Sequence, residues 1–240
     1  MRRVLTVAIA LSVLSTAAAS PLWDGAVELW GRYDDLVPGY MQILFVQYNG
    51  GGDLVSTDES EIRIFVDETG EIQSHIVFAR KDGEDVTAER REDPSGGAPP
   101  FGGGPPDDED DDGGGFAGLQ RSPFDPAEQA NLAYTDTGRV EWVDGRRTRR
   151  FEFEHQTARN SRNVGTAWLA VSDGEPVRVE LTIDPLPAFV NEFAMVQGFT
   201  RDDDDRLIVD ELEFSGRAGF LFFTRVIESR LVFSEYFPSP

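Results

Sequence analysis

From residue 40 onward, apolar and polar residues alternate along most of the chain, which is the pattern of strands with one buried face. In residues 177–183, every second residue is Val, Leu or Ile, and Arg, Glu and Thr lie between them. Similar runs include 72–80, 85–91, 207–214 and 230–237. Together they predict about ten or eleven strands.

Three Asp-Gly pairs separate such runs, at 82–83, 144–145 and 173–174. Glycine tolerates the positive φ that tight hairpin turns need, so each pair predicts a hairpin. Many strands joined by short turns favour an antiparallel meander. We therefore predict a mainly β fold, a strongly curved or unclosed antiparallel β-barrel preceded by an N-terminal amphipathic helix.

Two predicted strands are apolar on both faces. The run 40–48 has few polar residues, and the run 219–227 places aromatic residues on both faces, among them Phe220, Phe222 and Phe223. A strand that is apolar on both faces needs cover on both. We therefore expect a sheet curled around a helix or a ligand, and these three phenylalanines are candidate ligand-binding residues in an apolar groove.

The segment before residue 40 has helical periodicity. Apolar residues recur at steps of three and four from Trp23 to Tyr33, and Pro38-Gly39 would end a helix over residues 21–37. Trp23 and Trp30 lie on one stripe of that helix. Such a helix either packs into the core or lies as a lid over a ligand groove, so both tryptophans join the candidate ligand-binding residues.

Residues 92–123 break the strand pattern with Gly-Gly, Pro-Pro and Gly-Gly-Gly repeats and the acidic run from Asp107 to Asp112. Such a segment buries too little apolar surface to offset the entropy of ordering it. We expect a disordered loop within a single β domain over residues 20–240. Two domains joined by a linker are the alternative.

The first nineteen residues have the layout of a secretory signal peptide. Arg2 and Arg3 precede an apolar run from Val4 to Leu14, and Ala17 to Ala19 form a small-residue cleavage site. We expect residues 1–19 to be removed and the protein to be periplasmic or secreted. No later segment approaches 18 apolar residues, so we expect no integral membrane segment after cleavage.

The amino-acid composition limits the kinds of partner that the protein can bind. The formal charge is −22, and both nucleic acid and an anionic membrane repel such a surface. The chain has no cysteine, which excludes disulfides and thiolate chemistry. Lys81 is the single lysine among 22 basic residues, a bias that suits either a high-salt habitat or a GC-rich genome.

No local motif points to catalysis, a metal or a cofactor. The sequence lacks the serine-hydrolase, zinc-protease, P-loop and dinucleotide-binding signatures. His75 and His155 are predicted on different strands, and a zinc site needs three or four ligands. Asp108 to Gly113 resembles the start of an EF-hand loop, but Leu119 stands where the loop needs a carboxylate. We predict a non-enzymatic protein without a cofactor or a metal site.

Two charged clusters have structural explanations. Asp202 to Asp205 lie between predicted strands and are expected to form an exposed turn. Arg146, Arg147, Arg149 and Arg150 form a basic cluster that strand alternation would divide between two faces, Arg147 and Arg149 on one. We expect these arginines to neutralise neighbouring carboxylates. A site for an anionic headgroup is the alternative.

The stretch from Val164 to Leu169, followed by the stretch from Pro176 to Leu181, is similar to a hairpin of the outer-membrane lipoprotein-sorting proteins. With the signal peptide, first helix and meander, it resembles the LolA/LolB-type fold of periplasmic lipoprotein carriers. The Gly/Pro/Asp insertion departs from that family. The resemblance implies an unclosed barrel whose concave apolar face, covered by a helix, receives acyl chains.

Two functions follow from these observations. The first is a non-enzymatic periplasmic binding or carrier protein for a lipid or a lipoprotein acyl chain. The second is an interaction or assembly module of the envelope, with a filled core and no small-molecule ligand.

Overall fold

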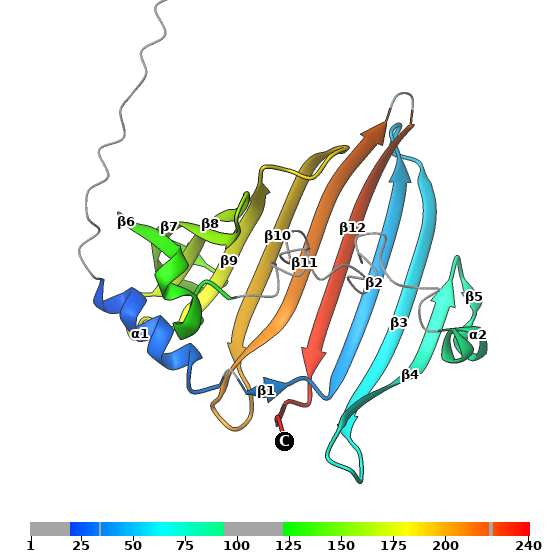
Figure 1. Cartoon of the computed structure of the whole chain (residues 1–240), viewed down its shortest axis with the longest axis horizontal. Helices are drawn as coiled ribbons and strands as arrows, with labels where there is room; N and C mark the ends of the chain where they lie inside the picture. Colours follow the sequence, from blue (N-terminus) through cyan, green and yellow to red (C-terminus); the bar gives the residue numbers. More distant parts are fainter. Residues whose placement is uncertain (1–19, 34, 94–121, 221–222) are drawn as a thin grey trace, which may run out of the picture.

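The computed structural model describes residues 20–33, 35–93, 122–220 and 223–240. Within them, eleven strands form one antiparallel sheet in the order β5-β4-β3-β2-β12-β11-β10-β9-β8-β7-β6 (Figure 1). β5 and β6 are the two edges and do not pair with each other, so the sheet is open. The prediction of a mainly β, unclosed antiparallel fold is confirmed. The fold consists of α1 (Pro21–Trp30), β1 (Leu36–Val37), β2 (Tyr40–Asn49), β3 (Leu54–Val66), β4 (Ile72–Lys81), β5 (Glu84–Asp85), α2 (Thr87–Glu92), η3 (Pro126–Asn131), β6 (Leu132–Val143), β7 (Arg146–Ala158), β8 (Ser161–Ala170), β9 (Pro176–Asp184), β10 (Val190–Arg201), β11 (Leu207–Phe220), β12 (Phe223–Ser234) and β13 (Phe237–Pro238).

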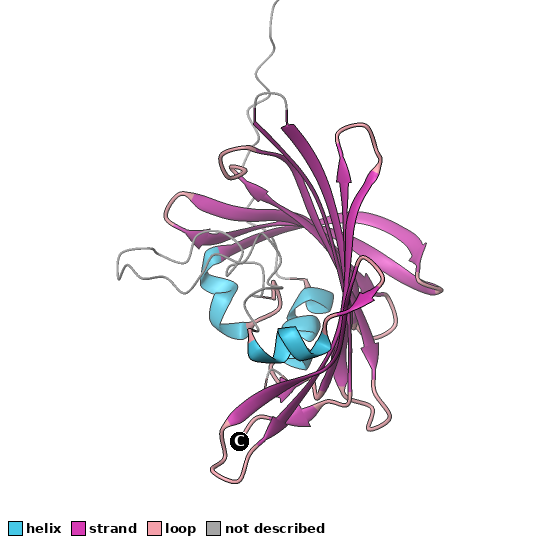
Figure 2. Ribbon diagram, turned by 90° about the vertical axis from the view of Figure 1, so that its right-hand side faces the viewer, coloured by secondary structure: helices cyan, strands magenta, loops and turns pink. Residues whose placement is uncertain are grey.

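The sheet curves around the side on which the helices lie (Figure 2). We call this side the concave face and the other the convex face. The main hydrophobic core lies on the concave face at the β6 end of the sheet, where α1 and η3 pack against it. The short helix α2 packs against β4 near the other edge.

The first helix forms as predicted but ends early. Pro21 occupies its first turn, where a missing N–H costs nothing, and Asp24 favours the positive end of the helix dipole. α1 ends at Trp30, whereas the periodicity predicted a helix to residue 37. A Cβ on Gly31 would lie 2.9 Å from Pro126 Cγ, so the helix end packs against η3. That tertiary contact is invisible in the local pattern.

The Asp-Gly turns are confirmed. Asp82 and Gly83 have φ values of 51° and 88°, and Asp144 and Gly145 have φ values of 48° and 75°. Two successive positive φ values match the right-handed twist of hairpin strands. These turns join β4 to β5 and β6 to β7.

The strand predicted at 85–91 is wrong. Only Glu84–Asp85 are extended, and the chain then turns into α2. The side chains of α2 bind the sheet, because Arg91 donates hydrogen bonds to the backbone carbonyls of Ile76 and Val77 at 2.7 and 3.0 Å. Arg90 forms a buried ion pair with Asp58 of β3.

The strands predicted at 219–227 and 230–237 are also wrong in their boundaries. Phe220 and Phe223 are Cα partners, so the chain reverses between them. β12 then continues from Phe223 to Ser234 without a break at residue 228. The apolar run that was expected to cross the sheet as one two-faced strand is therefore the tip of a hairpin.

β2 was expected to be covered on both faces, and this expectation is wrong as well. None of its ten residues is fully buried, and Leu44 on the convex face is 41% exposed. The apolar residues of β2 are thus shared between a half-buried concave face and a convex face that is open to solvent.

Two predictions fall on parts of the chain outside the described residues, namely the signal peptide over 1–19 and most of the disordered loop over 92–123. The two ends of that loop are described. Glu92 ends α2, and Ser122 and Pro123 are buried. At these ends of the predicted loop, Glu92 is helical but exposed, whereas Ser122 and Pro123 are packed. The sheet joins strands from before and after the segment, because β2 pairs with β12.

Candidate functional site

The predicted tryptophan stripe of α1 lies against the core. Trp23 is 1% exposed. Its indole stacks on Tyr134 at 4.4 Å between ring centroids and lies 5.1 Å from Phe124 and 5.6 Å from Phe151. The indole N–H donates a hydrogen bond to Gln129 Oε1 at 3.1 Å. The groove expected beneath Trp23 is therefore filled by aromatic side chains.

An open cavity of about 610 Å³ lies beside this cluster, between α1, η3 and the start of β6. One side of Trp23 lines it, with Val27, Pro126, Leu132 and Tyr134. Trp30 lies two turns further along α1 and is half-buried. Its ring meets the ring of Phe199 of β10 edge-on, with 6.0 Å between the ring centroids. Both tryptophans thus adjoin the same core from α1.

The predicted phenylalanines are not brought to the same place. Phe220 and Phe223 pair at the tip of the β11–β12 hairpin, and Phe222 lies outside the described residues. Trp30 contacts Phe199, which pairs with Val209 near the other end of β11. Eleven residues of strand separate Val209 from Phe220, a span of about 35 Å. The backbone positions of Phe220 and Phe223 thus lie at the opposite end of β11 from the contact of Trp30 with Phe199.

The structure reveals a set of residues that the sequence analysis missed. Residues of β11, β12 and β2 that pair with one another form four rows, which we call the concave-face ladder. The rows are Leu212–Leu231–Ile43, Phe214–Ser229–Phe45, Gly216–Ile227–Gln47 and Ala218–Arg225–Asn49.

Two contacts assign the ladder to the concave face. Phe214 pairs with Met195 of β10, which belongs to the core beneath α1. Phe45 pairs with Asp58 of β3, which binds Arg90 of α2. Because paired residues of neighbouring strands point to the same side, the ladder lies between the two helices.

The ladder is apolar at one end and polar at the other. Its large apolar residues are half-buried, except Ile227, which is 5% exposed. The sequence signal was present as alternation in 40–48 and 223–234. It was hidden because β2 is apolar on both faces and because residues 219–227 were predicted as one strand, whereas Phe220 and Phe223 pair with each other.

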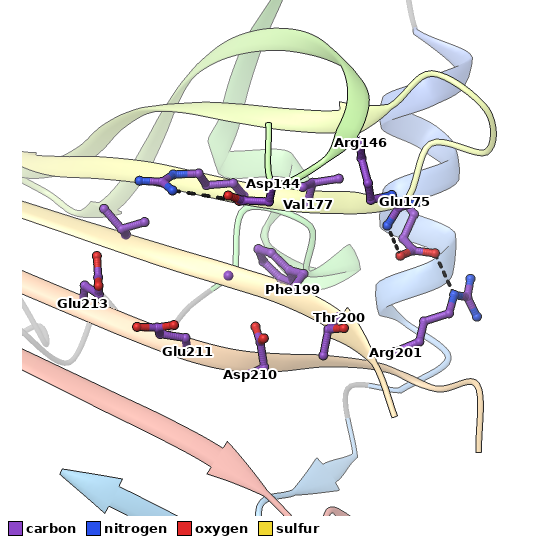
Figure 3. Close-up of a pocket in the computed structure, with 13 residues that line it drawn as sticks. Asp144, Arg146, Glu175, Val177, Phe199, Thr200, Arg201, Asp210, Glu211 and Glu213 are labelled. Carbon is purple, nitrogen blue, oxygen red and sulfur yellow. Dashed lines mark hydrogen bonds and ion pairs between the residues drawn. The ribbon is translucent and has the colours of Figure 1, made fainter. Parts of the chain in front are cut away.

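The convex face is charged instead. A cleft of about 700 Å³ on this side is lined by acidic and basic side chains from β9, β10 and β11 and from the β6–β7 turn (Figure 3). The Glu175 carboxylate is buried there and binds both Arg146 and Arg201, the latter at 2.7 Å. Burial and the neighbouring Glu211 and Asp144 carboxylates raise the pKa of Asp210. The cleft therefore contains a network of ion pairs and the Asp210 carboxyl, whose ionised form is destabilised.

Replacing Asp210 by asparagine is expected to raise the melting temperature by a few degrees at pH 7. A carboxyl whose pKa is raised in the folded state binds its proton more tightly there than in the unfolded chain. Its cost is absent below the ordinary pKa of about 4 and fully present above the folded value. Thermal melts at pH 7 and pH 3 measure this, with Asp203→Asn as the exposed control. An equal gain at both pH values would contradict the assignment.

The other charged predictions are resolved as follows. Arg146 binds Glu175, Arg149 binds Asp136 at 2.7 Å and Arg150 binds Glu152 at 3.2 Å, so the expected neutralisation is confirmed for these three of the four arginines. β7 pairs with β8 without a register shift over residues 148–156, so Arg149 lies on the face of Phe151 and Arg150 on the opposite face, as strand alternation predicted. The run 202–205 forms the β10–β11 turn, as predicted.

His155 and His75 lie far apart in the sheet, on β7 and β4. His155 is buried, with Nε2 at 3.0 Å from Glu128 Oε2 of η3, and it shares the buried face of Phe151 and Phe153. Among the described residues, no three His, Asp or Glu side chains are grouped to hold a metal ion. No helix in the described ranges is long and apolar enough to cross a membrane.

No protein-family model and no curated protein matches the chain. Among solved structures, it is similar to an outer-membrane lipoprotein-sorting protein domain from Vibrio parahaemolyticus, at 10% identity and a TM-score of 0.42, over 90% of this chain and 93% of that one. It is also similar to a DUF1329 family protein from Desulfovibrio piger (15% identity, TM-score 0.37, 88% and 91% covered). A third is a LolA superfamily protein from Nitrosomonas europaea (9% identity, TM-score 0.35, 89% and 92% covered).

Two of these three structures are described as a lipoprotein-sorting protein domain and a LolA superfamily protein. Identities of 15% or less limit the likeness to the fold. What the protein binds has to follow from its own residues.

Proposed function

We propose that this protein is a non-enzymatic, exported binding or carrier protein that takes the acyl chain of a lipid or a lipoprotein on its concave face. One observation carries the proposal: Ile43, Phe45, Leu212, Phe214 and Leu231 form an apolar surface that is only half-buried between α1 and α2. Contiguous apolar surface that remains partly accessible is typical of ligand or partner sites.

The energetics suit a hydrocarbon ligand. Burying one methylene contributes about 0.8 kcal/mol, so a chain of a dozen carbons provides enough to exceed the cost of immobilising it. The residue types fit as well, because the first row of the ladder contains only leucine and isoleucine. The layout of residues 1–19 as a signal peptide supports a periplasmic or secreted location.

The experiment compares two consecutive residues of β2 that face opposite sides. Ile43 belongs to the ladder, whereas Leu44 pairs with Arg230 and Glu59 on the convex face. Ile43→Asp is expected to weaken binding of 1-monohexadecanoylglycerol at least about tenfold, because a carboxylate would meet the hydrocarbon. Leu44→Asp introduces the same charge one residue away and is expected to leave binding unchanged.

Isothermal titration calorimetry below the critical micelle concentration measures both variants, and a cooperative thermal melt checks that each is folded. Ile43→Asn replaces the first variant if the charge prevents folding. Equal losses in both variants, or the absence of binding to the wild type, would contradict the proposal.

An interaction module of the envelope is the second candidate, and one observation favours it. Trp142 is 74% exposed on β6, the edge strand of the sheet. An open edge with an exposed aromatic side chain suits the addition of a partner strand. Absence of acyl binding, with the fold intact, would favour this candidate.

A further inference from the structure

Most charged residues of the three central strands lie on the convex face. There, the β11–β12 pairs contain Glu211, Glu213 and Glu228 together with Arg217 and Arg230. The twelve residues of the concave-face ladder include no carboxylate and one cation, Arg225. In a chain with 44 acidic residues, this absence from the described ladder marks a local site with a positive charge.

Arg225 differs from most arginines of the described chain. Arg146, Arg162 and Arg206, for example, each bind two carboxylates. Within the part of the chain that the structure describes, the guanidinium of Arg225 has one weak hydrogen bond, from Nη1 to the carbonyl of Thr224 at 3.4 Å. It is half-buried and retains most of its donors.

The described residues that flank Arg225 on β11 and β2 are small or already hydrogen-bonded. Ala218 lies opposite on β11, and Gly216 is two residues along the same face. Asn49 lies opposite on β2, but its amide is engaged in its own turn, with Nδ2 at 2.9 Å from Asp53 Oδ2. Small residues on one side and an occupied amide on the other leave the guanidinium as the principal donor.

The position of Arg225 matches one end of an amphiphile. Ile227 follows it on the same face, and the rows of Phe45 and Ile43 lie beyond. The distance from the Arg225 row to the Ile43 row is six residues of strand, about 20 Å. Along this direction Arg225 comes first, then the buried Ile227, and then the less buried apolar residues of the Phe45 and Ile43 rows.

We propose that Arg225 binds the anionic end, a carboxylate or a phosphate, of a ligand whose acyl chain lies along the apolar rows of the ladder. The inference rests on the proposed function and specifies its ligand as an anionic lipid or fatty acid. A planar guanidinium forms two parallel hydrogen bonds to an oxyanion, which lysine and amides do not reproduce. Because the net charge of −22 repels anions at long range, binding is measured at 0.15 M salt, where the screening length is about 8 Å.

The test uses ligands with one acyl chain and different ends. Hexadecanoate and hexadecanoyl lysophosphatidylglycerol carry an anion, 1-monohexadecanoylglycerol is neutral, and inorganic phosphate has no chain. Arg225→Gln is expected to weaken binding of both anionic lipids about tenfold and to leave monohexadecanoylglycerol unchanged. Arg159→Gln, which removes an exposed arginine at the β7–β8 turn, is the charge-matched control and is expected to change neither. Arg225→Lys is expected to restore only part of the affinity.

The outcomes separate this inference from the proposed function. Absence of binding for every acyl ligand would overturn both. Binding of the neutral lipid with no effect of Arg225→Gln on the anionic ones would overturn the headgroup site alone. Displacement of hexadecanoate by millimolar inorganic phosphate, lost in Arg225→Gln, would assign the residue to free phosphate and overturn the lipid assignment. If Arg225→Gln fails to melt cooperatively, Arg225→Met gives the same comparison.

Discussion

Replacing Trp23 by alanine is expected to lower the free energy of unfolding by about 3–5 kcal/mol. The indole is buried among Phe124, Tyr134, Phe151 and Phe153, and its removal leaves a cavity that these rings cannot all close. It also leaves the Gln129 amide oxygen without its donor. Urea unfolding, with the midpoint and slope both fitted, measures the loss.

Trp142→Ala is the matched control for this prediction. Trp142 is 74% exposed on β6, so the same truncation is expected to change the free energy of unfolding by less than about 0.5 kcal/mol. A small loss for Trp23→Ala would mean that α1 is loosely attached, and the description of its tryptophan as core would be wrong.

Gly165→Ala is expected to destabilise the protein by about 3 kcal/mol. Gly165 faces the core from β8, and an added Cβ would lie 2.4 Å from the carbonyl oxygen of Glu180, 2.7 Å from Phe153 Cζ and 2.9 Å from Leu181 Cβ. Backbone and an interior ring must move to admit one methyl group, which is costly in a close-packed core.

Gly25→Ala provides the opposite case. This residue lies inside α1, and its Cβ would meet nothing closer than the Asp173 carbonyl at 3.8 Å. Alanine there is expected to stabilise by about 0.5–1 kcal/mol, because glycine loses more backbone entropy in a helix. Thermal and urea unfolding measure the stability change in both variants. If Gly165→Ala leaves the stability unchanged, β8 and β9 are more widely spaced than described.

Several features of the fold could be predicted because their causes are local. The Asp-Gly pairs specify their turns through the backbone freedom of two residues, and the alternation in 177–183 follows from a strand with one buried face. The number of strands and the open antiparallel sheet followed from these signals. The pairing of β2 with β12 had no local signal, because its partners come from opposite ends of the sequence.

The errors arise where distant residues decide the local structure. α1 stops at Trp30 because η3 packs against Gly31. The run at 219–227 is apolar whether it crosses the sheet or turns, so periodicity alone could not locate the hairpin tip. The polar residues Glu228 and Arg230 suggested a break between two strands. Both belong to one continuous strand, β12, and lie on its convex side.

The sequence predicted the chemical character of the candidate site, an apolar surface, but not its position in the sheet. The sequence indicated an apolar groove near a tryptophan-bearing helix, and the structure fills the space under Trp23 with Phe124, a residue that follows the predicted disordered segment. The ladder could not be assembled from the sequence, since its three strands become neighbours only through the pairing of β12 with β2 and β11.

The order of the strands also constrains when the sheet can form. β2 is the first long strand to be synthesised and β12 is the last, and the two pair over ten residues. A chain that emerges N-terminus first cannot complete its sheet until β12 has emerged, so β2 to β5 wait with an open edge through nearly all of synthesis or export. Contacts of such long sequence separation slow folding. We expect the β2–β12 pair to form last, after the hairpins between consecutive strands on either side of it.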